Sequence, residues 1–166
     1  MAKADGMILF AGQYADLEIA REDFEVIKAL HKEKLIGRYD SALFTKMDGG
    51  KVKIIDTDES FRARGATAGA LGGAILGLIF PPTLLLIGGG AALGAAVGHV
   101  AGGIPRGYLK ELGDMLDEGE AGIILAGEMT VGEFEDRIMK RAAKMSKKEI
   151  DVDTEQLKKD VDEAAE

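Results

Sequence analysis

A short apolar run over residues 7–11 opens the chain and predicts a buried strand, because glycine bounds it on both sides. The apolar positions then change to helical spacing, and Asp16 stands where an N-cap residue is expected. One face of this predicted helix carries Leu17, Ala20, Phe24, Ile27 and either Leu30 or His31. The pattern therefore predicts a strand followed by an amphipathic helix that ends near Gly37.

Four further segments outside the central part of the chain have clear patterns. Residues 39–47 and 52–57 are predicted strands, joined by a tight turn at Asp48-Gly49-Gly50-Lys51, since glycine accepts the positive φ of such turns. Residues 108–116 have helical spacing, and residues 121–126 form another apolar run. The elements follow the order strand, helix, strand, strand, helix, strand.

This order is the split βαβ pattern of ferredoxin-like folds, with four antiparallel strands and both helices on one face of the sheet. We therefore predict an α+β protein whose ferredoxin-like domain is discontinuous, over residues 1–60 and 106–128. Residues 61–105 form an insert between the third strand and the second helix.

The insert contains two runs of glycine at four-residue spacing, and no charged residue occurs between positions 65 and 105. Spacing of four places residues on one helical face, and small residues there let another helix approach closely. The insert is therefore predicted to be a glycine-zipper helical hairpin, with its tip at Phe80, Pro81 and Pro82. The helix-packing residues are Gly65, Gly69, Gly73, Gly77, Gly90, Gly94, Gly98 and Gly102.

Such a hairpin exposes an apolar surface that something must cover. One interpretation is insertion into a membrane from the cytoplasmic side, with Arg62, Arg64 and Arg106 at the base of the hairpin. The alternative is a soluble cytoplasmic homo-oligomer in which the hairpins fill the interior. Both interpretations predict that copies of the chain assemble with one another.

A third helical pattern follows the last predicted strand, over residues 129–148. Thr130 and Glu133 form a capping box at its start. Four basic residues on one of its faces are candidates for contact with lipid headgroups. They are Arg137, Arg141, Lys144 and Lys148. The alternatives are pairing with the acidic tail over residues 149–166, where a final helix is predicted over 154–165, or a simple solvated face.

The charge distribution narrows the class of partner. The chain carries a net charge of −8, and residues 149–166 contribute two basic and eight acidic residues, or −6 of that total. No basic surface of the kind that binds nucleic acid is indicated. The chain has no cysteine, which excludes disulfides, thiolate metal sites and cysteine nucleophiles. The first residues lack a signal-peptide pattern, so a cytosolic origin is expected.

Candidate chemistry is sparse. His99 is the only ionisable side chain between positions 65 and 105 and a candidate for a proton or ion path, although a neutral histidine bonded to a neighbouring carbonyl is the simpler interpretation. An acidic cluster around the end of the second helix lacks a histidine partner or ligand spacing, which favours a solvated face. It comprises Glu111, Asp114, Asp117, Glu118 and Glu120. We predict no catalytic, cofactor-binding or metal-binding residue.

The turn at residues 48–51, the Gly/Ala-rich insert, the segment 108–113 and the strand 121–126 together resemble an uncharacterised bacterial family of small proteins. Its members are labelled as domains of unknown function or as membrane proteins. The resemblance covers residues 6–127 and implies a membrane location without implying catalytic residues. The function predicted is a non-enzymatic, membrane-associated, self-assembling protein. A soluble homo-oligomer, or a ferredoxin-like enzyme or ligand-binding domain, remains the alternative.

Overall fold

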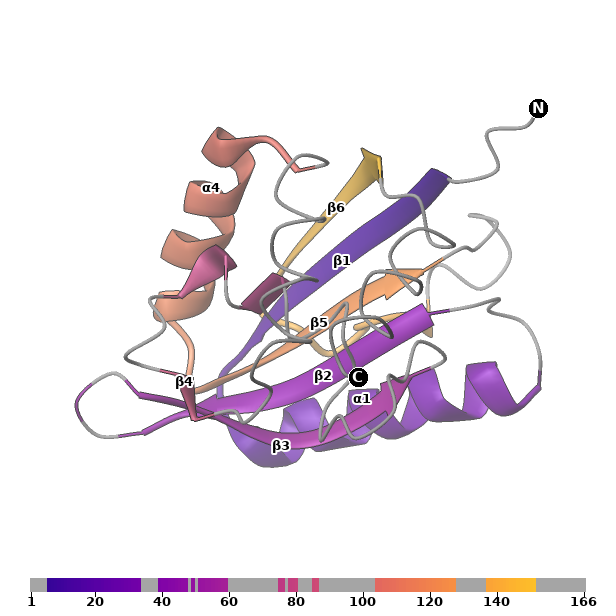
Figure 1. Ribbon diagram of the computed structural model, residues 1–166. Helices are drawn as coiled ribbons and strands as arrows, with labels where there is room; N and C mark the ends of the chain where they lie inside the picture. Colours follow the sequence, from indigo (N-terminus) through magenta and orange to yellow (C-terminus); the bar gives the residue numbers. More distant parts are fainter. Residues whose placement is uncertain are drawn as a thin grey trace, which may run out of the picture.

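The computed structural model of the protein is built around one six-stranded sheet (Figure 1). The residues that the structure describes are 6–33, 39–47, 49, 51–59, 75–76, 78–80, 85–86, 104–127 and 137–151. The strands are β1 (Gly6–Tyr14), β2 (Tyr39–Lys46), β3 (Val52–Glu59), β4 (Leu85–Leu86), β5 (Ala121–Gly127) and β6 (Lys144–Asp151). The helices are α1 (Leu17–Lys32) and α4 (Arg106–Asp117).

The elements predicted from the clearest patterns are confirmed one by one. Asp16 caps α1, and its carboxylate accepts a hydrogen bond from the backbone N–H of Ile19 at 2.9 Å. Gly49, between β2 and β3, has a φ of 83°, which an ordinary side chain rarely adopts. α4 and β5 occupy the positions expected of the second helix and the following strand.

The ferredoxin-like arrangement of these elements is nevertheless wrong. The strand order is β4-β3-β2-β5-β1-β6. β1 pairs with β5, and β2 pairs with β3, both antiparallel, as a ferredoxin-like sheet requires. The central contact, however, joins β2 to β5, whereas a ferredoxin-like sheet joins its first strand to its third.

The reason is β6, a strand that the sequence pattern does not predict. A strand has two edges, and both edges of β1 are occupied, one by β5 and the other by β6 over eight residue pairs. β1 therefore has no edge left for β3. The predicted amphipathic helix over 129–148 is wrong over its described residues, 137–148. Residues 138–141 form a turn, and from Lys144 onward pairing with β1 overrides the helical spacing. The predicted helix over 154–165 lies outside the described residues.

α1 and α4, the helices expected on one face, lie on opposite faces of the sheet (Figure 1). Along β1, side chains alternate between the two faces. Phe10 packs in the same cluster as Phe24 of α1, whereas Leu9 packs in the same cluster as Leu112 of α4. The structure is therefore a sheet enclosed between two apolar clusters.

Residues of the insert complete the α4 side of this core. Ile75 and Leu76 have no exposed surface, and Phe80 is 6% exposed. The ring of Phe80 meets that of Phe44 on β2 edge to face, with 5.8 Å between centroids. The surface that covers these side chains is thus the sheet of their own domain.

The expected membrane-embedded glycine-zipper helical hairpin is corrected by two findings. Leu85 and Leu86, expected in its second helix, form β4 and pair in parallel with Val52 and Lys53 of β3. Phe80, expected at a distant tip, lies in the core. Among the described residues, no helix has the length and apolar character needed to cross a membrane.

Candidate functional site

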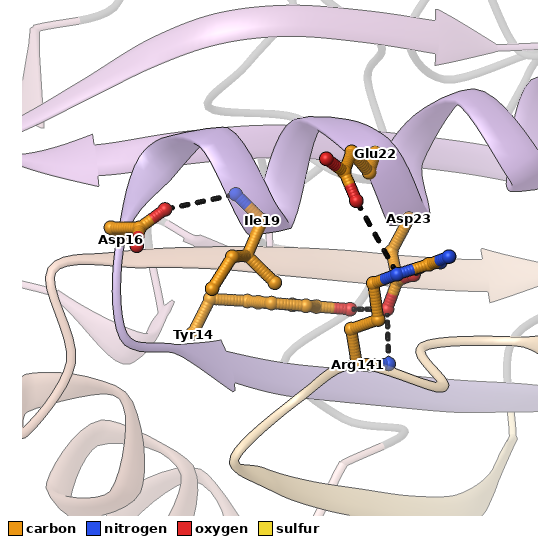
Figure 2. A network of polar contacts seen from close by, with 6 residues as sticks. All are labelled: Tyr14, Asp16, Ile19, Glu22, Asp23 and Arg141. Carbon is orange, nitrogen blue, oxygen red and sulfur yellow. Dashed lines mark hydrogen bonds and ion pairs between the residues drawn. The ribbon is translucent and has the colours of Figure 1, made fainter.

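Two carboxylates in the described part of the chain, Asp23 and Asp40, are fully buried, and Figure 2 shows the contacts of Asp23. Asp23 has no exposed surface, and three donors surround it. The Tyr14 hydroxyl donates to Oδ2 at 2.8 Å, and the Arg141 backbone N–H donates to the same oxygen at 2.7 Å. Arg141 Nη1 donates to Oδ1 at 2.9 Å. The charge of Asp23 is thereby compensated.

Three separate segments bring these side chains together. Tyr14 ends β1, Asp23 lies in the second turn of α1, and Arg141 lies in the turn that precedes β6. Arg141 Nε also lies 3.3 Å from the exposed carboxylate of Glu22. The cluster therefore ties the segment leading into β6 to the helix that covers the sheet.

The turn before β6 depends on close packing against β1. A Cβ at Gly12 would lie 2.8 Å from Met139 Sδ, so any other residue there would require the Met139 side chain to shift. Met139 itself has a φ of 55°, which is uncommon for a residue with a side chain. The backbone N–H of Ala143 donates to the carbonyl of Gln13 at 2.8 Å. These contacts fix the start of β6.

The electrostatics of the cluster favour the neutral tyrosine and the charged arginine. Burial raises the pKa of Tyr14, and its hydrogen bond to Asp23 raises that pKa further. The hydrogen bond from Arg141 to Asp23 raises the pKa of the guanidinium above its already high value. Tyr14 therefore keeps its proton and cannot serve as a base near neutral pH. Neither Tyr14 nor Asp23 is exposed, so these two side chains hold elements together and offer no surface of their own to a substrate.

A second group of contacts surrounds the solvent side of α4 and β6. Lys144 Nζ lies 2.9 Å from Glu118, and this ion pair lowers the pKa of the Glu118 carboxyl. The ammonium of Lys148 lies 5.3 Å from the ring centroid of Tyr108. The Tyr108 and Ser146 hydroxyl oxygens are 2.6 Å apart, and burial raises the pKa of Tyr108. These contacts join α4 to β6.

The structure separates the four basic residues that the sequence places on one helical face. Arg141 pairs with Asp23 and Glu22, Lys144 pairs with Glu118, and Lys148 stacks on Tyr108. Arg137 is exposed. Pairing with acidic groups of the same chain was one of the alternatives, although it invoked the tail and not α1 and α4.

Two residues of the acidic cluster at the end of α4 also form ion pairs within the chain. Asp117 binds Lys46 of β2, and Glu118 binds Lys144 of β6. Lys46 also donates to the Asp117 carbonyl at 2.8 Å. The cluster therefore joins the C-terminal end of α4 to two strands, β2 and β6. In the described part of the chain, no group of three or more histidine and acidic side chains could hold a metal ion.

Several predicted site residues lie outside the described residues. They are the eight zipper glycines (Gly65, Gly69, Gly73, Gly77, Gly90, Gly94, Gly98 and Gly102), Pro81, Pro82 and His99. Sequence reasoning missed Asp23, yet a signal was present. Position 23 follows Ala20 by three and precedes Ile27 by four, so it falls on the apolar face of the predicted helix. A carboxylate on such a face needs a buried partner.

Comparison with known families shows which family the chain belongs to. The family described as Protein of unknown function (DUF1269) matches residues 66–162. The chain belongs to this family. The match begins in the insert and extends past β6, whereas the resemblance noted from the sequence covered residues 6–127. No curated protein and no solved structure matches the chain.

Proposed function

We propose that the protein is a non-enzymatic building block that assembles with copies of itself through the edges of its sheet. The observation that carries the proposal is the position of β6. It ends the sheet order, and none of the strands in the described ranges pairs with its outer edge. An edge strand presents a row of backbone N–H and C=O groups that can pair with another chain.

The covering of the sheet supports the choice of an edge over a face. α1 covers one face, and α4 together with Ile75, Leu76 and Phe80 covers the other. Parallel or antiparallel addition of a strand at an edge needs no face of the sheet, only unpaired backbone groups. The outer edge of β6 offers these groups over eight residues.

The closed polar cluster supports a non-enzymatic role. Catalytic groups must reach the atoms on which they act. Tyr14 and Asp23 are fully buried and satisfied by one another and by Arg141. Their role in the proposal is to hold β6 in position, so that its outer edge is presented in a fixed geometry.

The mass of the full chain in solution tests the proposal. Sedimentation velocity over a range of protein concentrations should reveal species heavier than the 17.6 kDa chain, with a share that rises with concentration. A single species of 17.6 kDa at every concentration would contradict self-assembly.

A further inference from the structure

We infer that β6 of one copy pairs with the outer half of β3 of the next copy, so that the sheets join end to end. The inference rests on the proposed function and specifies its interface. At the far end of the sheet, β4 pairs only with Val52 and Lys53. Residues 54–59 of β3 therefore have no outer partner among the strands of the described ranges.

The two free edges carry opposite charge. Residues 54–59 contain Asp56, Asp58 and Glu59 and no basic residue, which gives a net charge of −3. The first five residues of β6, 144–148, contain three lysines and no acidic residue, which gives +3, whereas Glu149 and Asp151 bring the net charge of the whole strand to +1. Complementary charges of this size favour encounter of the two edges and disfavour other pairings.

Two of these charged residues already form ion pairs within the chain. Asp56 binds Lys28 at 2.6 Å, and Lys144 binds Glu118 at 2.9 Å, with every side chain involved at least partly exposed. Exposed pairs contribute little net free energy, so they can exchange partners when a second copy approaches. Lys147 and Lys148 are exposed as well.

Strand direction is compatible with this contact. The four antiparallel contacts from β6 through β1, β5 and β2 to β3 place β6 and β3 in the same direction. A second copy in the same orientation would therefore add its β6 parallel to β3. β3 already accepts a parallel partner in β4.

Charge also disfavours the symmetric alternatives. A two-fold contact between two copies of β3 over residues 54–59 would bring carboxylates together, and one between two copies of β6 centred on residues 144–148 would bring lysines together. Lysines on an edge strand normally prevent indiscriminate pairing. Here they restrict β6 to an acidic edge, and the resulting head-to-tail contact leads to rings or filaments instead of a closed dimer.

A charge-reversal experiment on the full chain tests the inference. One variant carries Lys147→Glu and Lys148→Glu, which changes residues 144–148 from +3 to −1. The other carries Asp58→Lys and Glu59→Lys, which changes residues 54–59 from −3 to +1. Each variant alone should associate at least about tenfold more weakly than the parent, because its two edges carry charge of the same sign and repel each other.

A mixture of the two variants is the decisive test. The unaltered β6 of the second variant then meets the unaltered β3 of the first, so a one-to-one mixture should recover association. The matched control carries Arg106→Glu and Lys110→Glu, two exposed positions that lie on α4 and not on an edge strand, and should assemble as the parent does.

The outcomes separate the inference from the proposed function. If the parent assembles and both variants assemble equally well, the inference is overturned while self-assembly stands. If the parent stays a single chain, both fail. Circular dichroism checks that each variant folds. If one does not, salt replaces it: raising the ionic strength from about 0.05 M to about 0.5 M should weaken assembly of the parent about tenfold. Assembly indifferent to salt would overturn the inference.

Discussion

At the scale of single residues, the buried charge of Asp23 imposes a stronger constraint on the structure than any sequence motif does. Asp23 lies among apolar neighbours of α1 and is held by Tyr14 and Arg141. The sequence indicates that position 23 faces the core, but it does not indicate the partner, because Arg141 is 118 residues away in the chain. Long-range partners of this kind depend on the topology, which local patterns do not contain.

Replacing this carboxylate should destabilise the protein strongly. Removal of one partner from a buried ion pair typically costs about 3–5 kcal/mol. Arg141 is 49% exposed and keeps Glu22, so we expect Asp23→Asn to lower the free energy of unfolding by about 2–3 kcal/mol. Chemical denaturation measures the change. The neighbouring exposed carboxylate provides the control, since Glu22→Gln should cost less than about 1 kcal/mol. Equal effects of the two substitutions would refute the assignment.

The raised pKa of Tyr14 predicts a loss of stability in alkali. Because the folded state holds this proton more tightly than the unfolded chain does, the contribution is complete below about pH 10, the usual pKa of tyrosine. Above that pH the free energy of unfolding should fall by about 1.4 kcal/mol per pH unit on account of Tyr14. Denaturation of the parent and of Tyr14→Phe between about pH 9 and pH 11 tests this. The variant should lose less stability across the range, and identical slopes would show that Tyr14 does not contribute.

At the scale of elements, strands and helices with strong local patterns are predictable and their neighbours are not. α1 follows from apolar spacing and from Asp16, and the β2–β3 turn follows from its glycines. β6 does not follow, because its sequence has helical spacing and becomes a strand only by pairing with β1. One missed strand was sufficient to change the order of the sheet.

The contact between β2 and β5 depends on the absence of a side chain at Gly122. Gly122 lies opposite Phe44, and a Cβ there would come within 2.5 Å of the ring. Gly122→Ala should therefore lower the free energy of unfolding by about 1–3 kcal/mol through overpacking. Combining it with Phe44→Leu should cost less than the sum of the two single changes. Strict additivity in denaturation experiments would mean that the ring and the Cβ do not compete.

At the scale of the whole molecule, the insert and the sheet form one core. Composition predicts that the apolar side chains of the insert must be covered, but it does not say by what. Lipid, neighbouring copies and the domain's own sheet are equally apolar. The structure places Ile75, Leu76 and Phe80 against the face of the sheet that α4 covers. The family match extends from the insert through β6 and does not include β1, β2 or β3.

A substitution in the insert should therefore affect the stability of the entire protein. Phe80→Ala removes a ring that packs on Phe44, and we expect a loss of about 3 kcal/mol in the free energy of unfolding. Thermal unfolding followed by circular dichroism should keep a single transition at a lower midpoint. An unchanged midpoint would indicate that the insert folds apart from the sheet.

Amide hydrogen exchange at low and at high protein concentration tests the central claim, assembly through the sheet edges, most directly. Pairing between copies would give hydrogen-bond partners to outward-facing amides of β6 and of residues 54–59 in β3, and would leave α1 unaffected. We predict that protection rises with concentration in these two segments and not in α1. Protection that rises elsewhere, or that does not depend on concentration while the protein is assembled, would contradict the account.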